Sequence, residues 1–272
     1  MRFCVLLLAG CVAALGAEER NDIEYARPGG VALTLDASIP AGAGPFAAVI
    51  VVHGGGWQKG TKRSYDKPLL PVLTEAGFAW FTINYRLAPQ HRFPAAVEDV
   101  QAAVKWVKAH AKEYKVDVKR MALMGESAGG HLVAMAAVRE TKETQVAAVV
   151  DFYGPHDLYK REMERGKVTE NLNALLGIEK LDEAGQAKLK EASPINFVRK
   201  GLPPFLFIHG TKDASVPFEQ SPMMCAKLKA AGDRCEVFPV EGAPHGIGGW
   251  EGHPEWTAYK TKMVEWLRAT LR

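Results

Sequence analysis

Short apolar runs alternate along this chain with segments of helical spacing. The run 47–52 is continuously apolar, as in a strand that is buried on both faces of a sheet. In 95–111, by contrast, valines recur on one side at the period of a helix. This alternation predicts an α/β protein with a mostly parallel central sheet and helices on both faces. The expected strands are 31–39, 47–52, 78–84, 120–125, 146–152, 205–209 and 236–240, and the expected helices are 95–111, 129–139, 217–231 and 254–271.

The segment 154–196 interrupts this alternation. It is polar, irregular and helix-prone, and it is longer than an ordinary connection between a strand and a helix. We therefore expect a short cap-like or lid-like insertion over one end of the sheet. The sequence indicates no domain boundary after residue 17, so 18–272 is expected to form a single domain.

Residues 1–17 have the pattern of a signal peptide. Arg2 gives a positive start, 3–15 is almost wholly apolar, and small residues up to Ala17 offer a cleavage site before the chain turns polar. This pattern predicts a secreted or periplasmic protein. A lipoprotein anchored through Cys11 is one alternative, because Cys11 ends a stretch that looks like a lipobox. A buried N-terminal strand is another.

Composition and charge narrow the class of function. The chain has 272 residues, of which 47% are hydrophobic and 24% are charged, with a formal net charge of +3. Because the charges are interspersed and form no basic stripe, nucleic-acid binding is not expected. No apolar run reaches the length of a membrane-spanning helix, so no integral membrane segment is expected after removal of the signal.

Two of the four cysteines lie beyond the predicted signal. Cys225 and Cys235 are an even pair in a chain that is expected to be exported, and this is compatible with one disulfide. No CxxC pair and no cluster of histidine and cysteine suggests a zinc site. No metal or cofactor is therefore expected.

The segment 125–129, Gly-Glu-Ser-Ala-Gly, matches the GxSxG pattern of a nucleophile elbow. In that motif the serine sits on a sharp turn between a strand and a helix, and small flanking residues relieve the crowding of a strained backbone. An expected strand precedes the motif here and an expected helix follows it. We therefore predict that Ser127 is a nucleophile.

A serine hydroxyl needs a base, and the base needs a carboxylate that orients it. In this fold the two follow the serine in the order Asp or Glu, then His. Asp213 lies just beyond the expected strand 205–209, and His245 lies just beyond 236–240. Both positions fall where the carboxyl ends of strands carry ligand-contacting loops, so Ser127, Asp213 and His245 are the predicted catalytic triad.

The transition state of acyl transfer also needs hydrogen-bond donors for an oxyanion. The segment 53–56, His-Gly-Gly-Gly, follows a buried strand and matches the oxyanion loop of lipases and esterases. Its glycines allow backbone N–H groups to approach a substrate closely. The N–H of Ala128, next after the nucleophile, is expected to complete the hole.

Together these motifs resemble a known family. They are HGGGW at 53–57, NYRLAP at 84–89 followed by FPAA at 93–96, GESAGG at 125–130, HGTKDASVP at 209–217 and the late His-Gly pair at 245–246. The set is similar to the hormone-sensitive-lipase-like branch of the α/β-hydrolases. It is most similar there to bacterial secreted acetyl-xylan and feruloyl-type esterases. This resemblance implies the α/β-hydrolase fold, Gly55, Gly56 and Ala128 as oxyanion donors, and a small-molecule or carbohydrate ester as substrate.

The expected function is that of a serine carboxylesterase acting on short-chain or aromatic acyl esters. Trp57 and Tyr153 are candidates to line the substrate pocket, with packing in the core as the alternative. Hydrolysis of an amide, as in arylformamidases or prolyl oligopeptidases, remains an alternative activity. A non-catalytic protein on a retained hydrolase scaffold is a third reading, but such a protein should have lost part of the triad or of the oxyanion loop.

Overall fold

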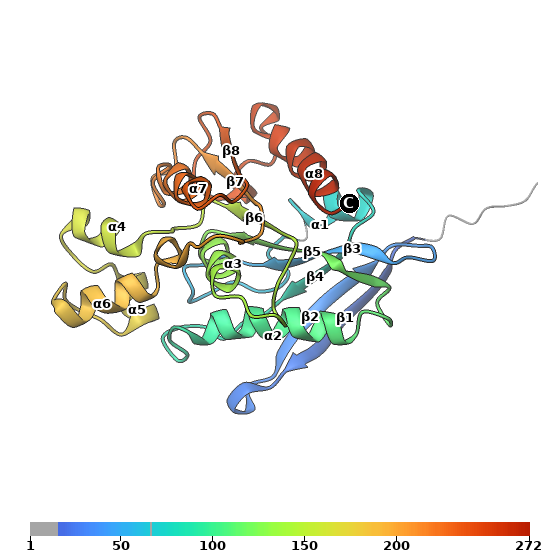
Figure 1. Ribbon diagram of the computed structural model, residues 1–272, viewed down its shortest axis with the longest axis horizontal. Coiled ribbons are helices and arrows are strands. Elements are labelled where there is room, and N and C mark those ends of the chain that lie inside the picture. Colours follow the sequence, from blue (N-terminus) through green and yellow to red (C-terminus); the bar gives the residue numbers. More distant parts are fainter. Residues whose placement is uncertain (1–15, 66) are drawn as a thin grey trace, which may run out of the picture.

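An eight-stranded sheet forms the centre of the computed structural model, which describes residues 16–65 and 67–272 (Figure 1). Almost all of the predicted signal peptide, 1–17, lies outside the described residues. The strands are β1 (Glu18–Ala26), β2 (Leu33–Ile39), β3 (Phe46–Val52), β4 (Ala79–Ile83), β5 (Val116–Glu126), β6 (Ala148–Phe152), β7 (Phe205–Gly210) and β8 (Cys235–Val240). The helices are α1 (Leu70–Glu75), α2 (Ala95–Ala109), α3 (Ala128–Val138), α4 (Leu158–Arg165), α5 (Glu170–Leu176), α6 (Glu183–Glu191), α7 (Gln220–Ala230) and α8 (Ala258–Thr270).

The strand order is β1-β2-β4-β3-β5-β6-β7-β8. From β4 to β8 all neighbouring strands are parallel, whereas β2 runs antiparallel to both β1 and β4. The predicted fold class, a mostly parallel sheet covered by helices, is confirmed. The carboxyl ends of β3, β5, β7 and β8 consequently lie at the same edge of the sheet.

Each face of the sheet has its own layer of helices. Ala48, Ile50 and Val52 of β3 belong to the core under α2, α3 and α7, while Val49 and Val51 belong to the core under α1 and α8. These five side chains of β3 are all fully buried. The continuous apolar run in the sequence therefore reflects a strand that is covered on both sides.

The segment between β6 and β7 forms the expected insertion. It contains α4, α5, α6 and a 3₁₀ turn (Pro194–Phe197), and the three helices lie together beyond one end of the sheet (Figure 1). Asp157 caps α4 by accepting from the Lys160 N–H, and Asp182 caps α6 by accepting from the Gly185 N–H. This polar sequence therefore forms short capped helices. Among 16–65 and 67–272, every helix is too short or too polar to cross a bilayer.

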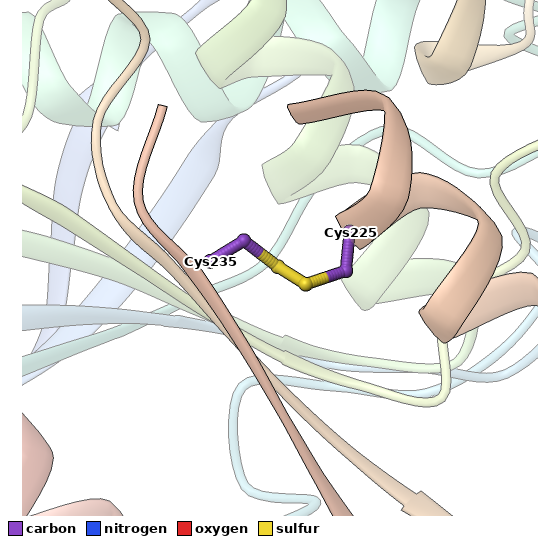
Figure 2. Close-up of a disulfide and its surroundings, with 2 residues drawn as sticks. All are labelled: Cys225 and Cys235. Carbon is purple, nitrogen blue, oxygen red and sulfur yellow. A yellow bond between two sulfur atoms is a disulfide. The ribbon is translucent and has the colours of Figure 1, made fainter. Parts of the chain in front are cut away.

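A disulfide joins Cys225 of α7 to Cys235 at the start of β8 (Figure 2). The Cα atoms are 5.5 Å apart and the cysteines are separated by 10 positions in the sequence. Both residues are buried. The bond therefore ties the helix that follows the Asp213 loop to the strand that precedes the His245 loop.

Removing this bond should lower stability without changing the fold. In the chain-entropy model, a crosslink that closes so short a loop contributes about 3 kcal/mol to the free energy of unfolding. We expect the double variant Cys225→Ser/Cys235→Ser to lose about that amount in urea unfolding. Reductant should shift the wild-type protein similarly and leave the variant unchanged. Equal unfolding midpoints for wild-type and variant protein would contradict this expectation.

Candidate active site

Four loops at the carboxyl ends of neighbouring strands meet at the site. The Gly-rich loop 53–56 follows β3, Ser127 follows β5, Asp213 follows β7 and His245 follows β8. Ser127 and His245 are 118 positions apart in the chain, but β5 to β8 run parallel in one sheet, so the loops at their carboxyl ends lie on the same side and come into contact. The sheet order therefore assembles the site that the motifs predict.

Ser127 occupies a strained turn between β5 and α3. Its backbone has φ 53° and ψ −116°, in the region of positive φ that L-residues rarely adopt. A Cβ on Gly125 would lie 2.2 Å from the Gly129 carbonyl oxygen, and a Cβ on Gly129 would lie 2.1 Å from the Val52 carbonyl oxygen. Only glycine fits either position. The two glycines of the motif are thus explained by backbone contacts around the serine.

The three predicted triad residues form a continuous hydrogen-bonded chain. The Ser127 hydroxyl lies 2.9 Å from His245 Nε2, and His245 Nδ1 lies 2.6 Å from Asp213 Oδ2. With Nδ1–H donating to the carboxylate, Nε2 is free to accept from the hydroxyl. This is the arrangement that allows a histidine to remove the serine proton.

Asp213 is held as an acceptor by several donors. Its Oδ1 accepts from the backbone N–H groups of Ser215 and Val216, each at 2.8 Å. Burial alone would raise the pKa of Asp213, but the hydrogen bonds from His209 and His245 outweigh burial and hold that pKa well below its usual range. His209 also contacts Ser221 Oγ and the Val216 carbonyl oxygen, so it braces this loop. The Asp213 carboxylate therefore stays ionised beside His245.

The Gly-rich loop lines the same cavity as Ser127. Gly55 and Gly56 have φ 107° and 60°, and a Cβ on Gly55 would lie 2.0 Å from the Lys59 carbonyl oxygen. Both glycines line the same cavity as Ser127. Ala128 lies in the first turn of α3, where a backbone N–H has no acceptor within the helix. The three predicted oxyanion donors are thus grouped around Ser127.

Glu126, beside the nucleophile, links the loops of the site through two buried tyrosines. Its Oε2 accepts from the Tyr65 hydroxyl at 2.6 Å and its Oε1 from the Tyr153 hydroxyl at 3.0 Å. The Tyr65 oxygen in turn accepts from the Gly54 N–H, and the Tyr153 oxygen accepts from the Ile247 N–H. One carboxylate therefore positions both the oxyanion loop and the histidine loop.

Burial is the main reason that these tyrosines stay protonated. It raises the pKa of Tyr65 and of Tyr153 well above the ordinary range, and the neighbouring Glu126 carboxylate raises both further. Each hydroxyl can therefore donate to Glu126 and still accept a backbone N–H. No pattern in the sequence predicts a role for Glu126 or Tyr65. They are 61 positions apart and belong to no motif as a pair.

Tyr153, for which the sequence left pocket lining and core packing both open, lies in the core. It is fully buried and lies outside the residues that line the cavity, with its ring packed against His245 at a centroid distance of 4.7 Å. Trp57 does line the cavity, and its indole Nε1–H donates to His131 Nδ1 at 3.1 Å. His131 Nε2–H donates to the Ala192 carbonyl oxygen at 2.7 Å. Burial lowers the pKa of His131 to about 4, so this histidine is a neutral link between the oxyanion loop and the insertion.

A cavity of about 610 Å³ lies in front of Ser127 and His245. One wall is formed by the oxyanion loop and Trp57, and the opposite side is formed by the insertion. The insertion contributes Pro155, Arg161, Thr169, Glu170, Asn171 and Leu172. Gln58 and Asn171 are hydrogen-bonded to each other across the two walls at 2.8 Å. In the part of the chain that the structure describes, no group of three or more histidine, cysteine or acidic side chains is placed to hold a metal ion.

Comparison with known proteins agrees with this geometry. A family model named BD-FAE matches residues 35–228. The esterase LipC of Mycobacterium tuberculosis is 34% identical over 217 residues, which are 75% of this chain and 53% of that protein. This chain thus spans about half the length of that relative.

Two solved structures cover nearly the whole chain. A truncated carbohydrate esterase from gut microbiota superposes with a TM-score of 0.81 at 26% identity, covering 93% of this chain and 96% of that one. The esterase Est2 of Thermogutta terrifontis superposes with a TM-score of 0.74 at 32% identity, with 94% of each chain covered. Est2 has been solved with propionate bound and with butyrate bound. These neighbours confirm the α/β-hydrolase fold.

The Glu126 network should be important for stability. Tyr65→Phe leaves the Gly54 N–H and Glu126 Oε2 without their partner, and Tyr153→Phe does the same to the Ile247 N–H and Glu126 Oε1. A buried polar group without a partner costs about 1–3 kcal/mol, so we expect each variant to lose that amount in urea unfolding.

Tyr159→Phe is the matched control for this measurement. The Tyr159 hydroxyl makes one long contact, 3.4 Å, with Gln186 Oε1 at a partly buried position. We expect this control to unfold within about 0.5 kcal/mol of the wild-type protein. Equal losses in all three variants would show that the network has no special role.

Proposed function

Because the chain belongs to the BD-FAE family, we propose that it is a serine carboxylesterase that works through an acyl-enzyme. The observation that carries this proposal is the chain Ser127–His245–Asp213, which faces a cavity beside three backbone N–H groups. A nucleophile, a base, an orienting carboxylate and an oxyanion hole are the parts that acyl transfer requires.

In the first half of the reaction, Ser127 Oγ attacks the ester carbonyl carbon while its proton passes to His245 Nε2. The carbonyl oxygen becomes an oxyanion that accepts from the N–H groups of Gly55, Gly56 and Ala128. Asp213 stabilises the imidazolium that forms. When the carbon–oxygen bond to the alcohol breaks, the imidazolium gives its proton to the leaving alkoxide, and the acyl group stays on Ser127.

The second half repeats these roles with water. His245 takes a proton from a water molecule as the oxygen of that water attacks the acyl carbon. The oxyanion forms again against the same N–H groups. Collapse of this intermediate expels Ser127 Oγ, which takes the proton from His245, and a carboxylic acid leaves. The residues return to their starting protonation states.

The proposed substrates are esters of short or aromatic acids, such as acetyl or feruloyl groups on a plant polysaccharide. Trp57 and the hydrogen-bonded pair Gln58–Asn171 line a cavity of about 610 Å³, and this size supports a small acyl group. Est2 binds propionate and butyrate, and another neighbour is a carbohydrate esterase. These two likenesses support a small acyl group and a carbohydrate alcohol.

We further propose that the protein is exported. The pattern of 1–17 is that of a signal peptide, with anchoring through Cys11 as the alternative outcome. The disulfide Cys225–Cys235 supports this proposal, because such bonds persist mainly in oxidising compartments. The mass of the mature protein recovered from its native host distinguishes cleavage near residue 17 from lipid attachment at Cys11.

Ser127→Ala should abolish ester hydrolysis while the protein remains folded. Loss of a triad nucleophile typically lowers kcat on the order of 10⁴–10⁶-fold. A fluorophosphonate should label Ser127 in the wild-type protein, and EDTA should not reduce activity, because all proposed reacting groups belong to the protein. The exposed Ser64 provides the control, and Ser64→Ala should keep both activity and labelling. Labelling at a serine other than Ser127 would falsify the assignment.

Short acyl chains should be preferred over long ones. We expect kcat/KM for 4-nitrophenyl acetate to exceed that for 4-nitrophenyl palmitate by at least about 100-fold, since each misplaced methylene in a closed pocket changes binding by about 1 kcal/mol or more. Acetate or ferulate release from xylan then tests the polysaccharide role. Preference for palmitate would overturn the proposed pocket, and faster turnover of N-formylkynurenine than of any ester would make the protein an amide hydrolase.

A further inference from the structure

One wall of the cavity carries a cation that no carboxylate neutralises. Arg161, on α4, lines the cavity together with Ser127 and His245. Its Nη2–H donates to the Ser215 carbonyl oxygen at 3.1 Å, while its Nε is buried and has no hydrogen-bond partner. Within 16–65 and 67–272, Arg161 forms no salt bridge. The Arg161 side chain is partly buried, and a buried N–H of a cation without an acceptor is costly unless something binds it.

The neighbouring carboxylate is already engaged by other groups. Glu162 is fully buried, and its Oε1 accepts from Arg165 Nη1 at 3.3 Å while its Oε2 accepts from the Thr169 N–H at 2.6 Å. Burial is the main influence that lowers the pKa of Arg161 to about 10, and the nearby Arg165 lowers it further against the opposing influence of Glu162 and Asp213. Arg161 therefore remains a cation at neutral pH without a contact partner of opposite charge.

A second unpartnered group lines the same wall. The Thr169 hydroxyl is buried and makes no hydrogen bond, although Thr169 stands at the N-cap of α5, where a side-chain bond is common. The other charged side chains of the cavity are Lys59, Glu126 and Glu170. Glu126 is engaged by Tyr65 and Tyr153, whereas Lys59 and Glu170 are exposed at the rim. The wall that carries Arg161 and Thr169 therefore has one cation and two polar groups, Arg161 Nε and the Thr169 hydroxyl, without hydrogen-bond partners.

We propose that Arg161, with Thr169, binds a carboxylate on the ester substrate. This proposal rests on the proposed esterase function and specifies its substrate class. The carboxylate belongs either to the acid, as in a dicarboxylic half-ester, or to the alcohol, as in an ester of a uronic acid. A guanidinium binds a carboxylate through parallel N–H···O bonds, and these are stronger than neutral hydrogen bonds. The Nε–H, which has no hydrogen-bond partner in the protein alone, is one of those donors.

Two pairs of substrates test the proposal and separate the two sources of the carboxylate. On the acyl side, mono-4-nitrophenyl succinate is compared with 4-nitrophenyl methyl succinate, after correction for spontaneous hydrolysis. On the alcohol side, acetate release from acetylated methyl β-glucuronoside is compared with release from acetylated methyl β-glucoside. In one pair we expect the wild-type enzyme to prefer the charged member in kcat/KM by about 10- to 100-fold.

Variants of Arg161 connect that preference to the guanidinium. Arg161→Gln should reduce the ratio of charged to neutral kcat/KM to about one, and Arg161→Lys should restore part of it. Arg165→Gln is the matched control, because Arg165 also contacts the Ser215 carbonyl oxygen, at 3.5 Å, but lies outside the cavity lining. This control should keep the wild-type ratio. Urea unfolding of each variant checks that it is folded.

Several results would overturn the proposal. One is a wild-type enzyme that shows no preference for the charged member of either pair. Another is a preference that persists in Arg161→Gln. A third is an equal loss of kcat/KM for charged and neutral substrates in that variant, which would make Arg161 a support for the Ser215 loop. In each of these cases hydrolysis of the neutral esters by the wild-type enzyme leaves the esterase function standing. If the wild-type protein hydrolyses neither member of either pair, the proposed function itself is wrong.

Discussion

The close contact between the end of β3 and the first turn of α3 is the constraint on which the site depends. At this point the backbone of Gly129 approaches the Val52 carbonyl oxygen so closely that no side chain fits between them. The contact holds Ser127 at positive φ and places the first turn of α3 against the Gly-rich loop. The proposed nucleophile and the proposed oxyanion donors therefore share one rigid junction, so their relative geometry is fixed before any substrate arrives.

The other half of the site is connected to this junction by polar groups that take no part in the proposed reaction. Glu126 joins the oxyanion loop through Tyr65 and the histidine loop through Tyr153. The disulfide joins α7, which follows the Asp213 loop, to the start of β8, which precedes the His245 loop. The oxyanion loop and the histidine loop are thus both tied to Glu126, and this limits the freedom that would otherwise misplace His245.

Much of the fold could be predicted from the sequence, as could the three residues that meet as Ser127–His245–Asp213, because both depend on local patterns. Buried parallel strands are continuous apolar runs, and a nucleophile elbow requires glycines at fixed spacing. β1 was not predicted, because an edge strand that is exposed along most of its length carries charged residues. The place of Tyr153 stayed open between pocket and core, because its position just beyond β6 does not say whether its ring points to the cavity or packs against His245. Arg161 and Glu126 act through contacts between distant segments, and such contacts leave no pattern in one sequence.

The insertion between β6 and β7 separates two tasks that many enzymes combine. The residues that do chemistry stand on the ends of core strands, whereas the wall that meets the rest of the substrate stands on α4 and α5. Mutations in that wall can therefore alter which ester is accepted without disturbing the backbone contact around Ser127. Over evolutionary time, such a division lets a lineage move between substrates by small steps, each of which passes through a folded and chemically competent protein.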